Sequence, residues 1–122
     1  MPEQPNVIEL NVYLAKRLGL VIEHEGTPCI CRQPTGAPYD RGVPYNWDPC
    51  MSMDDAMRAW EECGCESGSH CAKDGIRDGE WAAVFIRAGE AGMDGAKRPA
   101  EALSRALYAW LTMRRRGDER DT

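Results

Sequence analysis

The sequence has no apolar run approaching the roughly 20 residues that a helix needs to span a bilayer. Its first residues, 1–9, contain neither the basic start nor the apolar stretch of an export signal. Positive charge is not in excess either, because the formal net charge is −5, and this disfavours general binding to nucleic-acid phosphates. We therefore expect a cytoplasmic protein, without membrane partners or general nucleic-acid binding.

Motifs with a catalytic mechanism are also lacking. The only histidines are His24 and His70. His70 is next to Cys71, but neighbours on a strand point to opposite faces, which argues against a cysteine–histidine dyad there. The glycines of segment 89–95 match neither the Walker nor the dinucleotide-binding pattern. The sequence therefore predicts a protein that is not an enzyme.

What is present is typical of one globular domain. The chain has 122 residues, of which 43% are hydrophobic and 29% charged. We expect a single domain over residues 1–117 and a flexible polar tail over residues 118–122, with the last helix ending at Gly117. A first helix begins after Asn6, which forms a capping box with Glu9, and it stops at Gly19. A short hairpin follows over residues 20–32, and then a long loop over residues 33–47.

The second half of the chain begins with a helix capped by Ser52. One face of this helix is predicted to carry Met53, Ala56, Met57, Trp60 and Cys63. A weak strand near residues 70–72 precedes the best strand, 80–87, which is apolar on both faces and needs cover on both sides. A glycine-punctuated loop leads to the last helix, which begins at Pro99.

This order predicts an α/β (α+β) fold. A small antiparallel sheet is sandwiched between helices, with three helices and about four strands. Trp60, Trp81 and Trp110 are expected in the core.

The sequence resembles a family of small phage and prophage proteins, the phage ABA sandwich domain family. The likeness runs through residues 11–19, 44–60, 81–85 and 99–107, and depends on small and apolar residues in a fixed order. The cysteine-rich segment 63–71 and the proline-rich loop depart from it. The resemblance implies phage origin and a sheet covered by helices, and it carries no settled catalytic residues. It also implies that the protein acts in the cytoplasm of the bacterial host cell, in an accessory role such as inhibition of bacterial immunity.

The cysteine-rich segment is the most distinctive local feature. It contains Cys63, Cys65, His70 and Cys71, and thiolates and imidazole are zinc ligands. Common zinc knuckles use Cys-x-x-Cys pairs, whereas this segment has Cys-x-Cys. The alternatives are a zinc site and ordinary thiols, with no cofactor expected in the second case.

Two surfaces are candidates for binding an anionic ligand or a partner. Lys97 and Arg98 follow three glycines and precede a helix N-terminus, where free backbone N–H groups favour anions. The long loop supplies possible stacking or contact residues, which are Tyr39, Arg41, Tyr45 and Trp47. A flexible connection and a proline-stiffened cover are the ordinary structural interpretations.

An acidic cluster of Glu61, Glu62 and Glu66 suits a basic partner, or is a solvated helix end. The leading hypothesis is a non-enzymatic phage accessory protein that acts by binding. It would inhibit a bacterial immune complex such as CRISPR-Cas, or sequester a small nucleotide signal in a pocket of a homo-oligomer. The alternative is a zinc-stabilised structural or regulatory phage protein.

Overall fold

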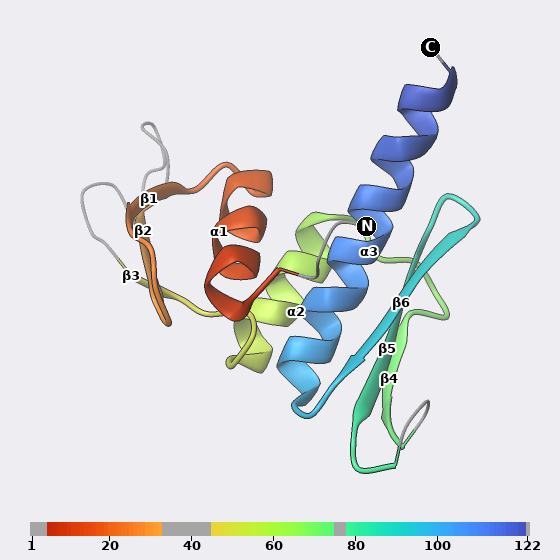
Figure 1. Cartoon of the computed structure of the whole chain (residues 1–122), viewed down its shortest axis with the longest axis horizontal. Coiled ribbons are helices and arrows are strands. Elements are labelled where there is room, and N and C mark those ends of the chain that lie inside the picture. The colour runs from red at the N-terminus through yellow and green to blue at the C-terminus, as the bar shows by residue number, and fades with distance from the viewer. Residues whose placement is uncertain (1–4, 33–44, 75–77, 122) are drawn as a thin grey trace.

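The computed structural model describes residues 5–32, 45–74 and 78–121 (Figure 1). These residues form three helices and six strands. The elements are α1 (Val7–Arg17), β1 (Val21–His24), β2 (Cys29–Arg32), β3 (Tyr45–Trp47), α2 (Met53–Glu62), β4 (His70–Lys73), β5 (Trp81–Arg87), β6 (Glu90–Ala96) and α3 (Pro99–Asp121). The strands pair antiparallel in two sheets, in the orders β1-β2-β3 and β4-β5-β6.

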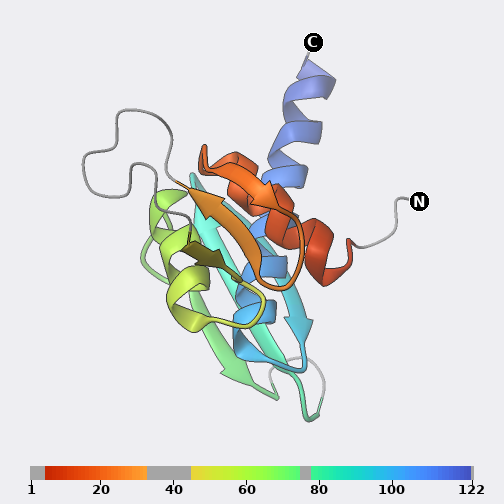
Figure 2. The same cartoon turned by 90° about the vertical axis from the view of Figure 1, so that its left-hand side faces the viewer.

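The helices lie between the two sheets (Figures 1 and 2). α3 packs on β5 and β6 and also contacts α1 and α2, whereas α1 contacts β1 and β2. The predicted α+β class with three helices is confirmed. The single sheet between helices is replaced by two sheets around a helical layer, because α3 is buried on more than one side. Its buried residues include Ala100, Ala102, Leu103, Ser104, Ala106, Leu107, Trp110 and Leu111.

The first helix and hairpin follow the predicted pattern. The Asn6 side chain accepts a hydrogen bond from the Glu9 backbone N–H, and the Glu9 carboxylate accepts one from the Asn6 N–H. Both bonds satisfy backbone donors that a helix start would otherwise leave unpaired. β1 and β2 then pair as expected. β3 extends this sheet at the end of the segment predicted as a loop.

A second hairpin, β5–β6, takes the place of the predicted glycine-rich loop. Arg87 pairs with Glu90, and the two residues between them, Ala88 and Gly89, have φ angles of 55° and 76°. Two consecutive positive φ angles are typical of a type I′ turn, which suits the twist of antiparallel strands. Gly92 lies beneath α3, where an added Cβ would be 2.5 Å from the Ala106 carbonyl oxygen. Gly92 therefore permits close packing of α3 on β6.

The core contains three aromatic residues that link α2, β5 and α3. Phe85 is fully buried, and its ring centroid lies 5.5 Å from that of Trp60 and 5.3 Å from that of Trp110. The core placement of Trp60 and Trp110 is thus confirmed, and Trp81 packs against the same core while partly exposed.

The last helix continues to Asp121, beyond the end predicted at Gly117. One glycine costs a helix only about 1 kcal/mol relative to alanine, so it does not by itself end one. Across the part of the chain that the structure describes, no helix combines the length and apolar character needed to cross a membrane.

Candidate functional site

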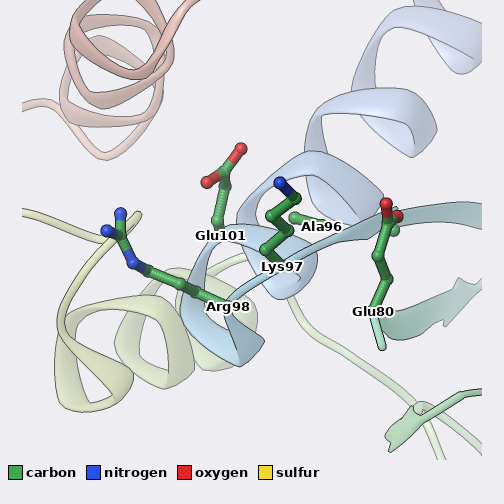
Figure 3. Close-up of a pocket in the computed structure, with 6 residues that line it drawn as sticks. Glu80, Ala96, Lys97, Arg98 and Glu101 are labelled. Carbon is green, nitrogen blue, oxygen red and sulfur yellow. The ribbon is translucent and has the colours of Figure 1, made fainter. Parts of the chain in front are cut away.

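A hollow of about 400 Å³ lies at the start of α3 (Figure 3). We call it the α3 hollow. Its lining residues are Glu80, Gly95, Ala96, Lys97, Arg98 and Glu101. The structure therefore brings both predicted cations, Lys97 and Arg98, to one hollow. It also adds two carboxylates that sequence reasoning missed, because Glu80 becomes a neighbour only through the pairing of β5 with β6.

The charges of the α3 hollow do not all point to an anionic ligand. Arg98 is directed away from Lys97 and toward the start of α2 (Figure 3), where its Nη1 donates a hydrogen bond of 3.0 Å to the Met51 sulfur. Glu101 accepts a 2.8 Å hydrogen bond from Arg105. Two carboxylates and two cations thus line the same hollow, and the carboxylates oppose a phosphate there.

The aromatic residues predicted to bind a ligand are not gathered at this hollow. Tyr39 and Arg41 lie outside the described residues, and for Tyr45 only the backbone, in β3, is described. Trp47 is fully buried, and its indole N–H donates a 3.1 Å hydrogen bond to the Asn11 carbonyl oxygen. The interpretation of Trp47 as a binding residue is therefore corrected, because the structure makes it part of the core.

Three methionines near the start of α2 are exposed instead. Met51, Met53 and Met57 have exposed fractions of 51%, 42% and 38%. The sequence predicts Met53 and Met57 on the apolar face, but the small residues Ala56 and Ala59 are buried there with Trp60. The helix therefore packs closely through small side chains, and both methionines lie at the edge of its buried stripe.

Carboxylates surround these methionines on the same outer side of α2. Met53, Met57 and Glu61 are spaced four residues apart, so they form one stripe, and Asp54 lies beside it. The exposed residues of this side are Met53, Asp54, Met57, Glu61 and Glu62, which we call the α2 surface. Arg58, which is half-buried, lies between Asp54 and Glu62, so this surface is apolar with a net negative charge, and it includes two of the three predicted acidic contact residues.

Glu66, the third predicted acidic residue, has a local structural role. Its backbone N–H donates to the Ile86 carbonyl oxygen at 2.8 Å, and its carboxylate accepts a 3.2 Å hydrogen bond from the Ala88 N–H. Glu66 therefore fastens the segment after α2 to the β5–β6 hairpin. It remains exposed, so a contact with a partner stays a prediction.

The four residues proposed for zinc lie in or before β4. Cys71 packs against the core, whereas His70 is exposed and its Nδ1 lies 2.7 Å from the Gly68 carbonyl oxygen. Among the residues that the structure describes, no group of three or more cysteine, histidine, aspartate or glutamate side chains is placed to hold a metal ion. Zinc binding by Cys63, Cys65, His70 and Cys71 stays a prediction.

Burial suppresses the acidity of several thiols. It raises the pKa of Cys63 and of Cys71, and it raises that of Cys50 to about 12. Burial also raises the pKa of Cys31 to about 12, with a further contribution from Cys29, whose sulfur lies 3.6 Å away. These thiols are protonated at neutral pH, and a protonated thiol is a poor nucleophile.

Comparisons with known proteins add no family. No protein-family model matches the chain, and no curated protein matches it. The resemblance to the phage ABA sandwich domain family therefore stays a prediction.

Proposed function

We propose that this chain is a non-enzymatic phage or prophage accessory protein that inhibits a bacterial immune complex by binding it through the α2 surface. The observation that carries the proposal is the side-by-side exposure of methionines and carboxylates on one helix. The phage setting and the immune target come from the family resemblance, and the exposed residues of α2 support the choice of contact surface.

Exposed methionines favour a protein partner. Three of the large hydrophobic residues exposed in the described part of the chain lie within the short segment 51–57. Methionine has a flexible, polarisable side chain that adapts to irregular apolar surfaces, and it is enriched at protein interfaces. A fixed apolar partner surface could therefore bury Met53 and Met57 without a change in the backbone of α2.

The carboxylates specify the charge of that partner. Asp54, Glu61 and Glu62 are exposed on α2. Grooves that hold nucleic acid in immune complexes are basic, because they neutralise phosphates. An acidic helix can occupy such a groove by charge complementarity, and its methionines add apolar contact. The proposed inhibitor thus competes with nucleic acid for a basic surface that has an apolar patch.

The nucleotide-sequestering route is less favoured by the geometry of the α3 hollow. A nucleotide phosphate beside Lys97 would also lie near Glu80 or Glu101. The repulsion from these carboxylates offsets the attraction of the cations. The protein-binding route therefore remains the proposal, and the two routes are separated by substitution.

The experiment measures phage plating on strains that each carry one defined bacterial immune system. Expression of the wild-type chain is expected to restore plating on at least one strain. The double reversal Glu61→Lys/Glu62→Lys should abolish this effect, and so should Met53→Ser/Met57→Ser. All four residues are exposed, so both variants are expected to fold.

Two control variants make the result specific. Glu25→Lys/Asp78→Lys makes the same change in net charge at exposed positions outside α2 and should retain inhibition. Lys97→Glu/Arg98→Glu should also retain it, because the proposal does not use the hollow. Inhibition that is lost only in the Lys97/Arg98 variant would refute the protein-binding route and support nucleotide sequestration. Unchanged plating on every strain would refute inhibition of those systems.

A further inference from the structure

The second face of the β4-β5-β6 sheet is apolar and lies outside the core. Residues paired across neighbouring strands share a face, and β5 contributes Ala82, Val84 and Ile86 to the face opposite α3. The strands present on this outer face His70, Ala72, Ala82, Val84, Ile86, Ala91, Met93 and Gly95. None of these described residues belongs to the main core cluster, although Ala82 is buried, and none carries a carboxylate, ammonium or guanidinium group.

The exposed apolar residues of this face indicate that it binds a partner. Met93 is the most exposed large hydrophobic residue among those described, at 59%. Ala72 and Ala91 on the edge strands are exposed as well, and Val84 is half-buried between them. A sheet strand that is apolar on both faces is ordinarily covered on both, and contiguous exposed apolar patches mark interaction sites. Among the described elements, α3 and Trp60 of α2 cover the other face of this sheet, and the loop at Gly68 lies against the Ile86 side chain at one end of the outer face.

We propose that this outer face binds the same face of a second copy of the chain. The charge of the protein supports this occupant. With a net charge of −5, two copies repel each other, and a contact centred on the uncharged strand residues of this face keeps most of their carboxylates apart, with Glu80 at its margin. A basic partner would instead be attracted to acidic surface, which this face lacks and the α2 surface supplies.

The pairing of residues makes the face complementary to itself. A two-fold axis parallel to the strands places β6 of one copy over β4 of the other, as a closed dimer requires. Met93 then faces His70 of the partner subunit, and His70 faces Met93 of the partner subunit. The small residues Ala72, Ala82 and Gly95 form one row across the sheet, and the Glu80 carboxylate lies at the Gly95 end of this row, 3.8 Å from the position of an added Cβ.

The ends of the strands add charge complementarity to this arrangement. Lys97 directly follows β6, and Asp74 directly follows β4 at the same end of the sheet. Both residues are exposed. With β6 over β4, Lys97 of each copy approaches Asp74 of the partner subunit, and the dimer gains opposite charges at both sides of its apolar contact.

The area of this face limits the affinity between the two copies. The three strands are spaced about 4.8 Å apart, and β5 rises about 3.4 Å per residue along its length. The flat area of the sheet is therefore roughly 340 Å² per copy, without the additional surface of the side chains. Stable interfaces bury about 800 Å² per partner. The face is smaller than that, so we expect a weak and reversible dimer, and a dissociation constant on the order of tens of micromolar is the value to test.

Sedimentation velocity over a wide concentration range tests the proposal. The wild-type chain is expected to change from monomer at about 1 µM to mostly dimer at about 500 µM, given a dissociation constant of that order. Met93→Lys places two like charges in the contact and should weaken the dimer at least about tenfold. Met57→Lys makes the same change in charge on α2 and should leave the dimer intact. This contrast is independent of the proposed inhibition.

Two results would overturn the proposal. A wild-type chain that remains monomeric at the highest concentration has no such interface. A dimer that survives Met93→Lys uses another surface, such as the free edge of β6. Circular dichroism checks that Met93→Lys folds. If it does not fold, Ala72→Lys, at an exposed position on β4, serves as the second variant for the same test.

Discussion

Trp60 of α2 lies edge-on to Phe85 of β5, with the ring centroids 5.5 Å apart and the ring planes at 85°. The Trp60 indole N–H also donates a 2.8 Å hydrogen bond to the Leu103 carbonyl oxygen of α3. One side chain thus fixes α2 against both a sheet and the central helix. This anchoring supports the exposed side of α2, which carries the carboxylates, and the edge of the buried stripe, which carries the methionines.

Removing the Phe85 ring should destabilise the whole domain. Phe85 is fully buried between Trp60 and Trp110, so Phe85→Ala leaves a cavity between α2 and α3. We expect a loss of about 3 to 5 kcal/mol in the free energy of unfolding, measured by urea denaturation. Met93→Ala, at an exposed position of the same sheet, serves as the control and should change it by less than about 0.5 kcal/mol. Equal effects would contradict the core assignment.

Gly92 is expected to tolerate no side chain. An alanine Cβ would lie 2.5 Å from both the Ala106 carbonyl oxygen and the Trp110 backbone nitrogen, so α3 must move away from β6. Gly92→Ala should lower the free energy of unfolding by about 2 to 3 kcal/mol. Gly79→Ala is the comparison, because Gly79 has a positive φ and open space around it, and it should cost about 1 kcal/mol. A smaller loss at Gly92 than at Gly79 would refute the close approach.

The sequence predicts the elements whose signals are local. The capping box at Asn6 and Glu9, the cap at Ser52 and the apolar run from Trp81 each require only neighbouring residues, and the structure contains all three elements. The strand β6 is not predictable in this way. Its glycines resemble loop residues, and their role becomes visible only when α3 packs on Gly92.

The sequence predicts the candidate site less well than the helices, because the site also depends on contacts between distant parts of the chain. Apolar residues at helical spacing predict a buried face, and this places Met53 and Met57 inside, but Ala56 and Trp60 fill the available space. Trp47 follows a proline-rich segment, which favours a surface position, yet pairing with Cys29 in β2 carries it into the core. The contacts that decide both cases join distant parts of the chain.

The indole of Trp47 should contribute through its hydrogen bond as well as its volume. Trp47→Phe removes the donor and leaves the buried Asn11 carbonyl oxygen without this partner. The expected loss is about 1 to 3 kcal/mol in the free energy of unfolding, with the smaller ring adding to it. In the plating assay, the folded fraction of this variant should still inhibit, since Trp47 is not part of the α2 surface. Unchanged stability together with lost inhibition would restore Trp47 as a binding residue.

The buried thiols should make the fold sensitive to high pH. The pKa values of Cys31 and Cys50 are raised from 9.0 to about 12, so above pH 9 the unfolded chain loses protons that the folded chain keeps. Stability from these thiols is therefore present below pH 9 and falls as the pH rises toward 12. Urea midpoints measured under reducing conditions from pH 8 to 11 should decrease, and the decrease should be shallower for Cys50→Ala. Identical pH slopes would contradict the burial of Cys50.

The most direct test of the central claim is the affinity between this chain and the immune complex whose strain it rescues. Titration of the purified complex with wild-type chain should give saturable binding that weakens with added salt, because opposite charges meet in the contact. Glu61→Lys/Glu62→Lys should raise the dissociation constant at least about tenfold, while Lys97→Glu/Arg98→Glu should leave it unchanged. Unaltered affinity in the Glu61/Glu62 variant, or loss of binding in the Lys97/Arg98 variant alone, would contradict binding through the α2 surface.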